Sequence, residues 1–146
     1  MGTAADLCKD VAAVLNAQSF SMPFTAIYEP IPRTDLQSVR SLEVFVCCDL
    51  ESRERINRAA WKKETSVQIG ILKHINKLNR VTEIDAMIAL VNEVAGFIGD
   101  APLPNCPWAQ PVRFQERPLY HFEHIYQYSV FSSVLSLVYL SGVRRG

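Results

Sequence analysis

The side chains best suited to binding a metal are His121 and His124, separated by two residues, with Cys106 upstream. Structural zinc sites usually contain a clustered pair of cysteines, and catalytic sites often add a carboxylate at a fixed spacing. Neither pattern accompanies this His-x-x-His sequence, and His124 can equally sit on a helical turn that faces water. We therefore expect no metal site and no bound cofactor.

A cysteine nucleophile would need a histidine base close to one of Cys47, Cys48 or Cys106. No cysteine is flanked by the glycines or the helix start that lower the pKa of a thiol. Cys47 and Cys48 are adjacent in a predicted strand, so their side chains point to opposite faces and a disulfide between them would be strained. With Cys8, they are expected to be free and mostly buried thiols of a reducing compartment, and we expect no catalytic residue.

The segment Asp49–Glu64 carries nine charges in sixteen residues. Tryptophan and arginine are enriched at the energetic centres of protein interfaces. A solvated segment held by surface ion pairs, each contributing about 0–1 kcal/mol, is the alternative. The candidate interface residues for contact with another subunit or a partner are Arg53, Arg55, Arg58, Trp61, Lys62 and Lys63.

Two predicted strands flank this charged segment. Leu42–Cys48 and Ser66–Ile75 alternate in a period of two and are rich in β-branched residues, which is typical of strands. Gly70 lies in the middle of the second strand, where glycine indicates close packing or a bulge. Because a tight hairpin needs two to five connecting residues, we expect residues 49–64 to form a long charged arm, with Arg53–Ala60 as a candidate helix.

Two helices are predicted from apolar residues at steps of three and four. The first covers residues 4–17 and follows Thr3 as N-cap, with Asp6 in an incomplete capping box. The second covers Glu83–Ile98, between Thr82 as cap and Gly99 as the residue after the helix.

The remaining segments are shorter or richer in proline. Residues 99–119 hold five of the eight prolines and are predicted to be an extended connector. The other predicted segments are a strand at Met22–Glu29, helical turns at Asp35–Val39 and Tyr120–Gln127, an edge strand at Val112–Gln115, a long central strand at Tyr128–Leu140 and an exposed tail at Gly142–Gly146.

These elements indicate a single α+β domain over residues 1–146. The order is helix, strand, strand, arm, strand, helix, connector and strand, which predicts an antiparallel sheet of about four strands with two main helices on one face. The opposite face is expected to be unusually apolar and to bury against another copy of the chain. Its residues would be Thr25, Ile27, Phe45, Cys47 and Leu72.

The bulk composition excludes some classes of protein. The net charge is zero, from 15 basic and 15 acidic side chains, which argues against a surface that binds nucleic acid throughout. The first residues lack the pattern of a secretory signal, and the most apolar stretch, Val130–Leu140, is too short for a membrane helix. We expect a soluble protein made in a cytoplasm.

The order of elements resembles the tail terminator, or tail completion, proteins of long-tailed bacteriophages. The resemblance rests on AADLCKDVAAVLNA at residues 4–17, the strand pair LEVFVCC and SVQIGILKHI around the arm, EIDAMIALVNEVAGFI at residues 83–98, and RPLYHFEHIYQYSVFSSVLSLVYL at residues 117–140. It spans nearly the whole chain. The adjacent cysteines and the length of the proline-rich connector have no counterpart in this pattern.

The resemblance implies a structural virion protein without enzymatic activity. Such proteins form a ring, typically a hexamer, that caps the tail tube, ends its elongation and joins the tail to the head connector. The implied partners are further copies of the chain, the tail tube protein and the head connector or stopper protein, with no membrane and with DNA contact at most through the ring lumen. The implied location is the neck of the virion, after assembly in the host cytoplasm.

Three alternatives remain open from the sequence. The first is another head–tail neck or joining protein. The second is a small cytosolic oligomeric enzyme with Cys/His chemistry. The third is a host adaptor or chaperone that binds a partner through the arm.

Overall fold

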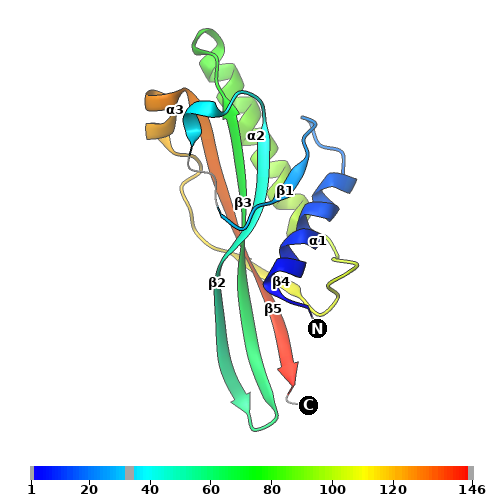
Figure 1. Ribbon diagram of the computed structural model, residues 1–146. Helices are drawn as coiled ribbons and strands as arrows, with labels where there is room; N and C mark the ends of the chain where they lie inside the picture. Colours follow the sequence, from blue (N-terminus) through cyan, green and yellow to red (C-terminus); the bar gives the residue numbers. More distant parts are fainter. Residues whose placement is uncertain (1, 32–34, 145–146) are drawn as a thin grey trace.

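A twisted five-stranded sheet organises the chain in the computed structural model, which describes residues 2–31 and 35–144 (Figure 1). The strands lie in the order β1-β2-β3-β5-β4. The elements are α1 (Ala4–Ala17), β1 (Ala26–Tyr28), the 3-10 turn η1 (Leu36–Ser38), β2 (Glu43–Asn57), β3 (Ala60–His74), the 3-10 turn η2 (Lys77–Asn79), α2 (Arg80–Ile98), β4 (Gln110–Phe114), α3 (Phe122–Tyr128) and β5 (Val130–Arg144). The predicted α+β class is confirmed, with a fifth strand at the edge.

The two long helices cover one face of this sheet, as predicted. Leu7 and Val11 of α1 and Leu90 and Val94 of α2 belong to one buried cluster with the strand residues that face them. The buried strand members of the cluster are Ala26, Val44, Val46, Val67, Ile69, Ile71, Phe131, Leu137 and Tyr139. Burial of these side chains is the main stabilising contribution to the domain.

The start of α1 agrees with the sequence, and that of α2 does not. The Asp6 amide donates to the Thr3 hydroxyl and the Asp6 carboxylate accepts from the Thr3 amide, which completes the capping box. Helix α2 begins at Arg80, three residues before its predicted start, and Asn79 rather than Thr82 is the N-cap. Gly99 is the C-cap with right-handed backbone angles.

Strand β1 corrects the predicted sheet in two ways. It covers Ala26–Tyr28 rather than Met22–Glu29, and it runs parallel to β2, with Ala26 opposite Val44. A parallel pair needs a crossover of about a dozen residues or more. Residues 29–42 provide that length and include η1, so the assumption that these consecutive strands pair antiparallel was wrong.

The face opposite the long helices is covered at one end by the chain itself. Leu72 is 3% exposed and packs in a second cluster with Leu36 and Val39, around η1, and with Val130. Half-buried Phe45 and Tyr128 complete this cluster. Cys47 is also buried. We expected this whole apolar face to be buried by another copy of the chain. For Leu72 and Cys47 that expectation was wrong, because both are buried within the subunit.

The segment expected to be an arm is the distal half of a β-hairpin. Strands β2 and β3 each contain fifteen residues and pair antiparallel from Glu43–Leu72 to Asn57–Ala60. Strand β5 continues beside β3, so the backbone of Arg144 pairs with Ala60. In Figure 1 the far halves of these three strands extend beyond the helices as a ribbon. The predicted helix at Arg53–Ala60 was wrong, and so was the predicted end of the last strand at Leu140, because β5 continues to Arg144. Gly142 is exposed, as expected, and residues 145–146 lie outside the described part.

The proline-rich connector folds back on α1 and on the sheet. Asp10 is 4% exposed and accepts hydrogen bonds from the amide (3.0 Å) and side-chain nitrogen (3.1 Å) of Asn105. The predicted edge strand is β4, which pairs with the middle of β5, and the amide of Gln115 donates to the carbonyl oxygen of Ser136. These bonds hold the connector against the body of the domain.

Candidate assembly interface

The distal ribbon is polar because neither of its faces meets a core. All residues from Asp49 to Ala59 are exposed, so no apolar alternation is required there. Backbone hydrogen bonds to β3, which pairs in turn with β5, hold these residues in a strand despite their charge. Asp49 occupies a register shift between Cys48 and Leu50, where it accepts a hydrogen bond of 2.8 Å from Gln68.

Four of the six predicted interface residues lie on one face of the ribbon. This face continues the face of the sheet that the two long helices cover. Arg53 is opposite Lys63 and Arg55 is opposite Trp61 in the β2–β3 register. The guanidinium carbon of Arg55 lies 5.8 Å from the centre of the Trp61 ring. The strands thus bring together residues that are far apart in the sequence, and a cation–π contact orients Arg55.

Lys63 differs from the other predicted interface residues because it is buried. Lys63 is 6% exposed. Its ammonium nitrogen lies 3.2 Å from a carboxylate oxygen of Glu51 and 5.7 Å from the centre of the Trp108 ring. The ion pair and the ring contact link the ribbon to the connector. We therefore assign Lys63 a role within the subunit.

The opposite face of the ribbon carries an ion-pair group at its base. The ammonium of Lys62 lies 3.4 Å from a carboxylate oxygen of Glu64, and the guanidinium of Arg113 on β4 lies 2.8 Å from the other oxygen. The hydrogen bond from Arg113 lowers the pKa of Glu64 and raises that of Arg113. This group joins β4 to β3 across β5.

The tip of the hairpin presents an apolar side chain among cations. Ile56 occupies a second register shift, between Arg55 and Asn57, and is 62% exposed. Such a bulge re-aims the side chain of the extra residue. Arg58 forms the turn, and its carbonyl oxygen accepts from the Arg55 guanidinium at 3.5 Å. An exposed isoleucine with arginines on both sides is suited to protein contact.

The outer edge of β2 is open along the ribbon. Strand β1 covers this edge at Val44–Val46, and the Glu29 amide adds one hydrogen bond to Val46. From Cys47 to Asn57, no other described strand pairs with that edge. Unpaired strand edges readily accept a strand of another chain, and charged side chains such as those here restrict which strands pair.

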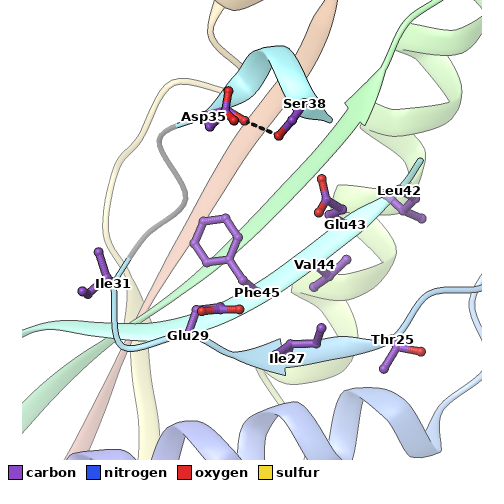
Figure 2. A pocket seen from close by; sticks show the side chains of 10 residues that line it. All are labelled: Thr25, Ile27, Glu29, Ile31, Asp35, Ser38, Leu42, Glu43, Val44 and Phe45. Carbon is purple, nitrogen blue, oxygen red and sulfur yellow. Dashed lines mark hydrogen bonds between the residues drawn. The ribbon is translucent and has the colours of Figure 1, made fainter. Parts of the chain in front are cut away.

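At its other end, β2 borders an open cleft of about 630 Å³ (Figure 2). The apolar side chains Ile27 and Phe45 line one side of it, and η1 lies across from them. The remaining lining residues include three with carboxylates: Glu29, Asp35 and Glu43. This cleft combines an apolar floor with an acidic rim.

The cysteines are placed unfavourably for nucleophilic chemistry. Cys8, Cys47 and Cys106 are buried and Cys48 is half-buried, and all four are free thiols, as expected. Burial raises the pKa of each thiol, to about 12 for Cys8. They are therefore protonated at neutral pH, whereas nucleophilic attack requires the thiolate.

The histidine pair forms a packed contact within α3 and its cap. The rings of His121 and His124 are 4.9 Å apart, and burial, followed by the charge of His121, lowers the pKa of His124. Within residues 2–31 and 35–144, no group of three or more histidine, cysteine or acidic side chains is placed to hold a metal ion.

Two parts of this surface could not be located from the sequence. The cleft joins residues from β1, η1 and β2, whereas the sequence pattern places Thr25, Ile27 and Phe45 on an open face of the sheet. Ile56 was overlooked because a single apolar residue within a charged segment has no period. Its bulged position depends on the register with β3.

A scan against protein-family models finds no match for this chain, and a search of curated proteins finds none either. Among the described helices, none is both long and apolar enough to cross a membrane.

Proposed function

We propose that this protein is a structural component of a bacteriophage tail that forms a ring, caps the tail tube, ends its elongation and joins the tail to the head connector. The observation that carries this proposal is the three-stranded ribbon, which extends beyond the helices with exposed cations and an open strand edge. A subunit that contributes such a ribbon to its neighbours gains an interface without using its own core. Repeated head-to-tail contacts of this kind close into a ring when the rotation per subunit allows it.

The chemistry of the described residues favours a structural role over an enzymatic one. Buried, protonated thiols and a packed histidine pair do not form a nucleophile and base in a substrate cleft. The cleft beside β2 is lined by apolar and acidic side chains, and no cysteine or histidine is among its described lining residues. We therefore propose no enzymatic activity. Another neck or joining protein of the same particle is the second candidate, because it would use the same ribbon and edge.

Negative-stain microscopy and native mass measurement of the purified protein test this proposal. We expect closed rings, typically of six copies, and we expect the protein to end the elongation of tail tubes when it is added to polymerising tube protein. A stable monomer in both the absence and the presence of tubes would contradict it.

A triple variant tests the part played by the ribbon. Replacing Arg53, Arg55 and Arg58 with alanine should weaken ring assembly, because these cations are exposed on the ribbon or at its turn. The control replaces Lys9 and Lys77, which are exposed cations outside the ribbon and outside the cleft beside β2, and should leave assembly unchanged. Unchanged assembly of the triple variant would show that the ribbon is not the interface.

A further inference from the structure

Two surfaces of this subunit complement each other. The tip of the hairpin presents Ile56, 62% exposed, between Arg55 and Arg58. Within residues 53–58, three arginines stand against one acidic side chain. The cleft has the opposite character, since exposed Ile27 and half-buried Phe45 lie beside the carboxylate of Glu29.

These surfaces cannot meet within one subunit. Phe45, in the cleft, and Ile56, at the tip, are both on β2 and eleven residues apart along it. A strand rises about 3.3 Å per residue, so their separation is on the order of 35 Å. The complement of each surface must therefore come from another molecule.

We propose that the hairpin tip of one copy binds in the cleft of a second copy, with Ile56 against Ile27 and Phe45 and with Arg55 and Arg58 beside Glu29. This proposal rests on the ring proposed above and names the contact that joins neighbouring subunits. The cleft, at about 630 Å³, has room for a whole turn rather than a single side chain. Burying Ile56 supplies affinity, and the opposite charges orient the turn.

The charges select this contact over a symmetric one. If two tips met across a two-fold axis, the arginines of both copies would face each other, and like charges across an interface oppose binding. The tip and the cleft are different patches, so the contact is heterologous and leaves one free tip and one free cleft at each step. Such contacts produce rings or open chains.

A mixing experiment tests the contact directly. The first variant, Ile56→Asp, removes the apolar side chain of the tip and leaves the cleft unchanged. The second variant, Glu29→Lys, reverses a charge in the cleft and keeps the tip. Each variant alone should self-associate at least about tenfold more weakly than the unmodified protein in sedimentation velocity. An equimolar mixture should form a one-to-one dimer and nothing larger, because the mixture contains a single usable tip and a single usable cleft per pair.

A charge exchange provides the matching rescue. Glu29→Arg and Arg55→Glu should each weaken self-association, and the two changes in one chain should restore part of it. Circular dichroism and thermal melting should show that the variants remain folded, because the side chains of Glu29, Arg55 and Ile56 are all exposed. If Ile56→Asp alters the fold, the milder Ile56→Ser takes its place in the mixture.

The outcomes separate this contact from the proposed ring. Rings that persist in both single variants would overturn the contact and leave the ring intact. Open chains in the unmodified protein that disappear in the variants would support the contact and contradict a closed ring. Oligomers larger than a dimer in the mixture would also overturn the contact, since they need a second interface.

Discussion

The ring of Phe45 lies directly over Gly70, its partner across β2 and β3. A β-carbon on Gly70 would come within 2.0 Å of the ring carbon Cζ and 2.2 Å of Cε1. The absence of a side chain at Gly70 therefore lets Phe45 lie flat on the sheet beside Leu72 and the second cluster. The close packing expected of a mid-strand glycine is confirmed.

We predict that Gly70→Ala destabilises the protein by about 1–3 kcal/mol, because the ring must leave its position to avoid the new methyl group. Urea denaturation measures this loss. The control is Gly96→Ala, at an exposed helix position where no atom lies within 4 Å of the added carbon. That change should stabilise the helix by about 0.5–1 kcal/mol. Equal stability of the Gly70→Ala variant and the parent protein would contradict the packing described.

A second prediction concerns Asp10, which fixes the connector to α1. We expect Asp10→Ala to lower the free energy of unfolding by about 1–3 kcal/mol, since two hydrogen bonds to Asn105 are lost. Limited proteolysis should then cut the chain near residues 100–109 faster than in the parent protein. Asp100→Ala, at an exposed acid, is the control, and it should change neither quantity. An unchanged cleavage rate in Asp10→Ala would show that other contacts hold the connector.

A third prediction follows from the buried thiol of Cys8. Burial raises its pKa from the ordinary value of 9.0 to about 12. Between these values the unfolded chain releases the proton and the folded chain retains it, so the free energy of unfolding falls as the pH rises from about 9 to about 12. The contribution of one group is at most about 1.4 kcal/mol per pH unit.

Urea titrations at several alkaline pH values measure this slope. Cys8→Ala should be less stable at neutral pH, because it leaves a small cavity, but its stability should depend less steeply on pH. Cys106→Ala provides a comparison at a second buried thiol. If the free energy of unfolding depends on pH equally with and without the Cys8 thiol, the raised pKa of that thiol is refuted.

The fourth prediction concerns the hydroxyl of Tyr139, which is buried in the main core. Within the described residues it has no hydrogen-bond partner, and burial raises its pKa. Tyr139→Phe removes an unsatisfied polar group and should stabilise the protein by about 1 kcal/mol in thermal or urea unfolding. Tyr126→Phe, at a residue 79% exposed, should lie within about 0.5 kcal/mol of the parent. A loss of stability in Tyr139→Phe would indicate that an ordered water binds the hydroxyl.

Local sequence patterns predicted the parts of this protein that bury a regular apolar stripe. The bounds of α1, the inner halves of β2 and β3, and the central position of β5 agree with the structure because their alternation records which side faces the core. The pairing of Thr3 with Asp6 was found for a similar reason, since a capping box depends on residues three apart. The close packing at Gly70 also has a one-residue signal.

The tertiary structure alone decided how the charged hairpin, β1 and the cleft are arranged. Residues 49–58 have no apolar period, because the ribbon leaves the core, and their strand is held by backbone bonds to β3, which in turn pairs with β5. The parallel pairing of β1 depends on contacts between segments distant in the sequence, and the cleft depends on the meeting of β1, β2 and η1. The sequence by itself determined which side chains must be buried locally. Contacts between distant segments decided where its exposed charges and its open cleft lie, because those contacts carry no repeating local signal.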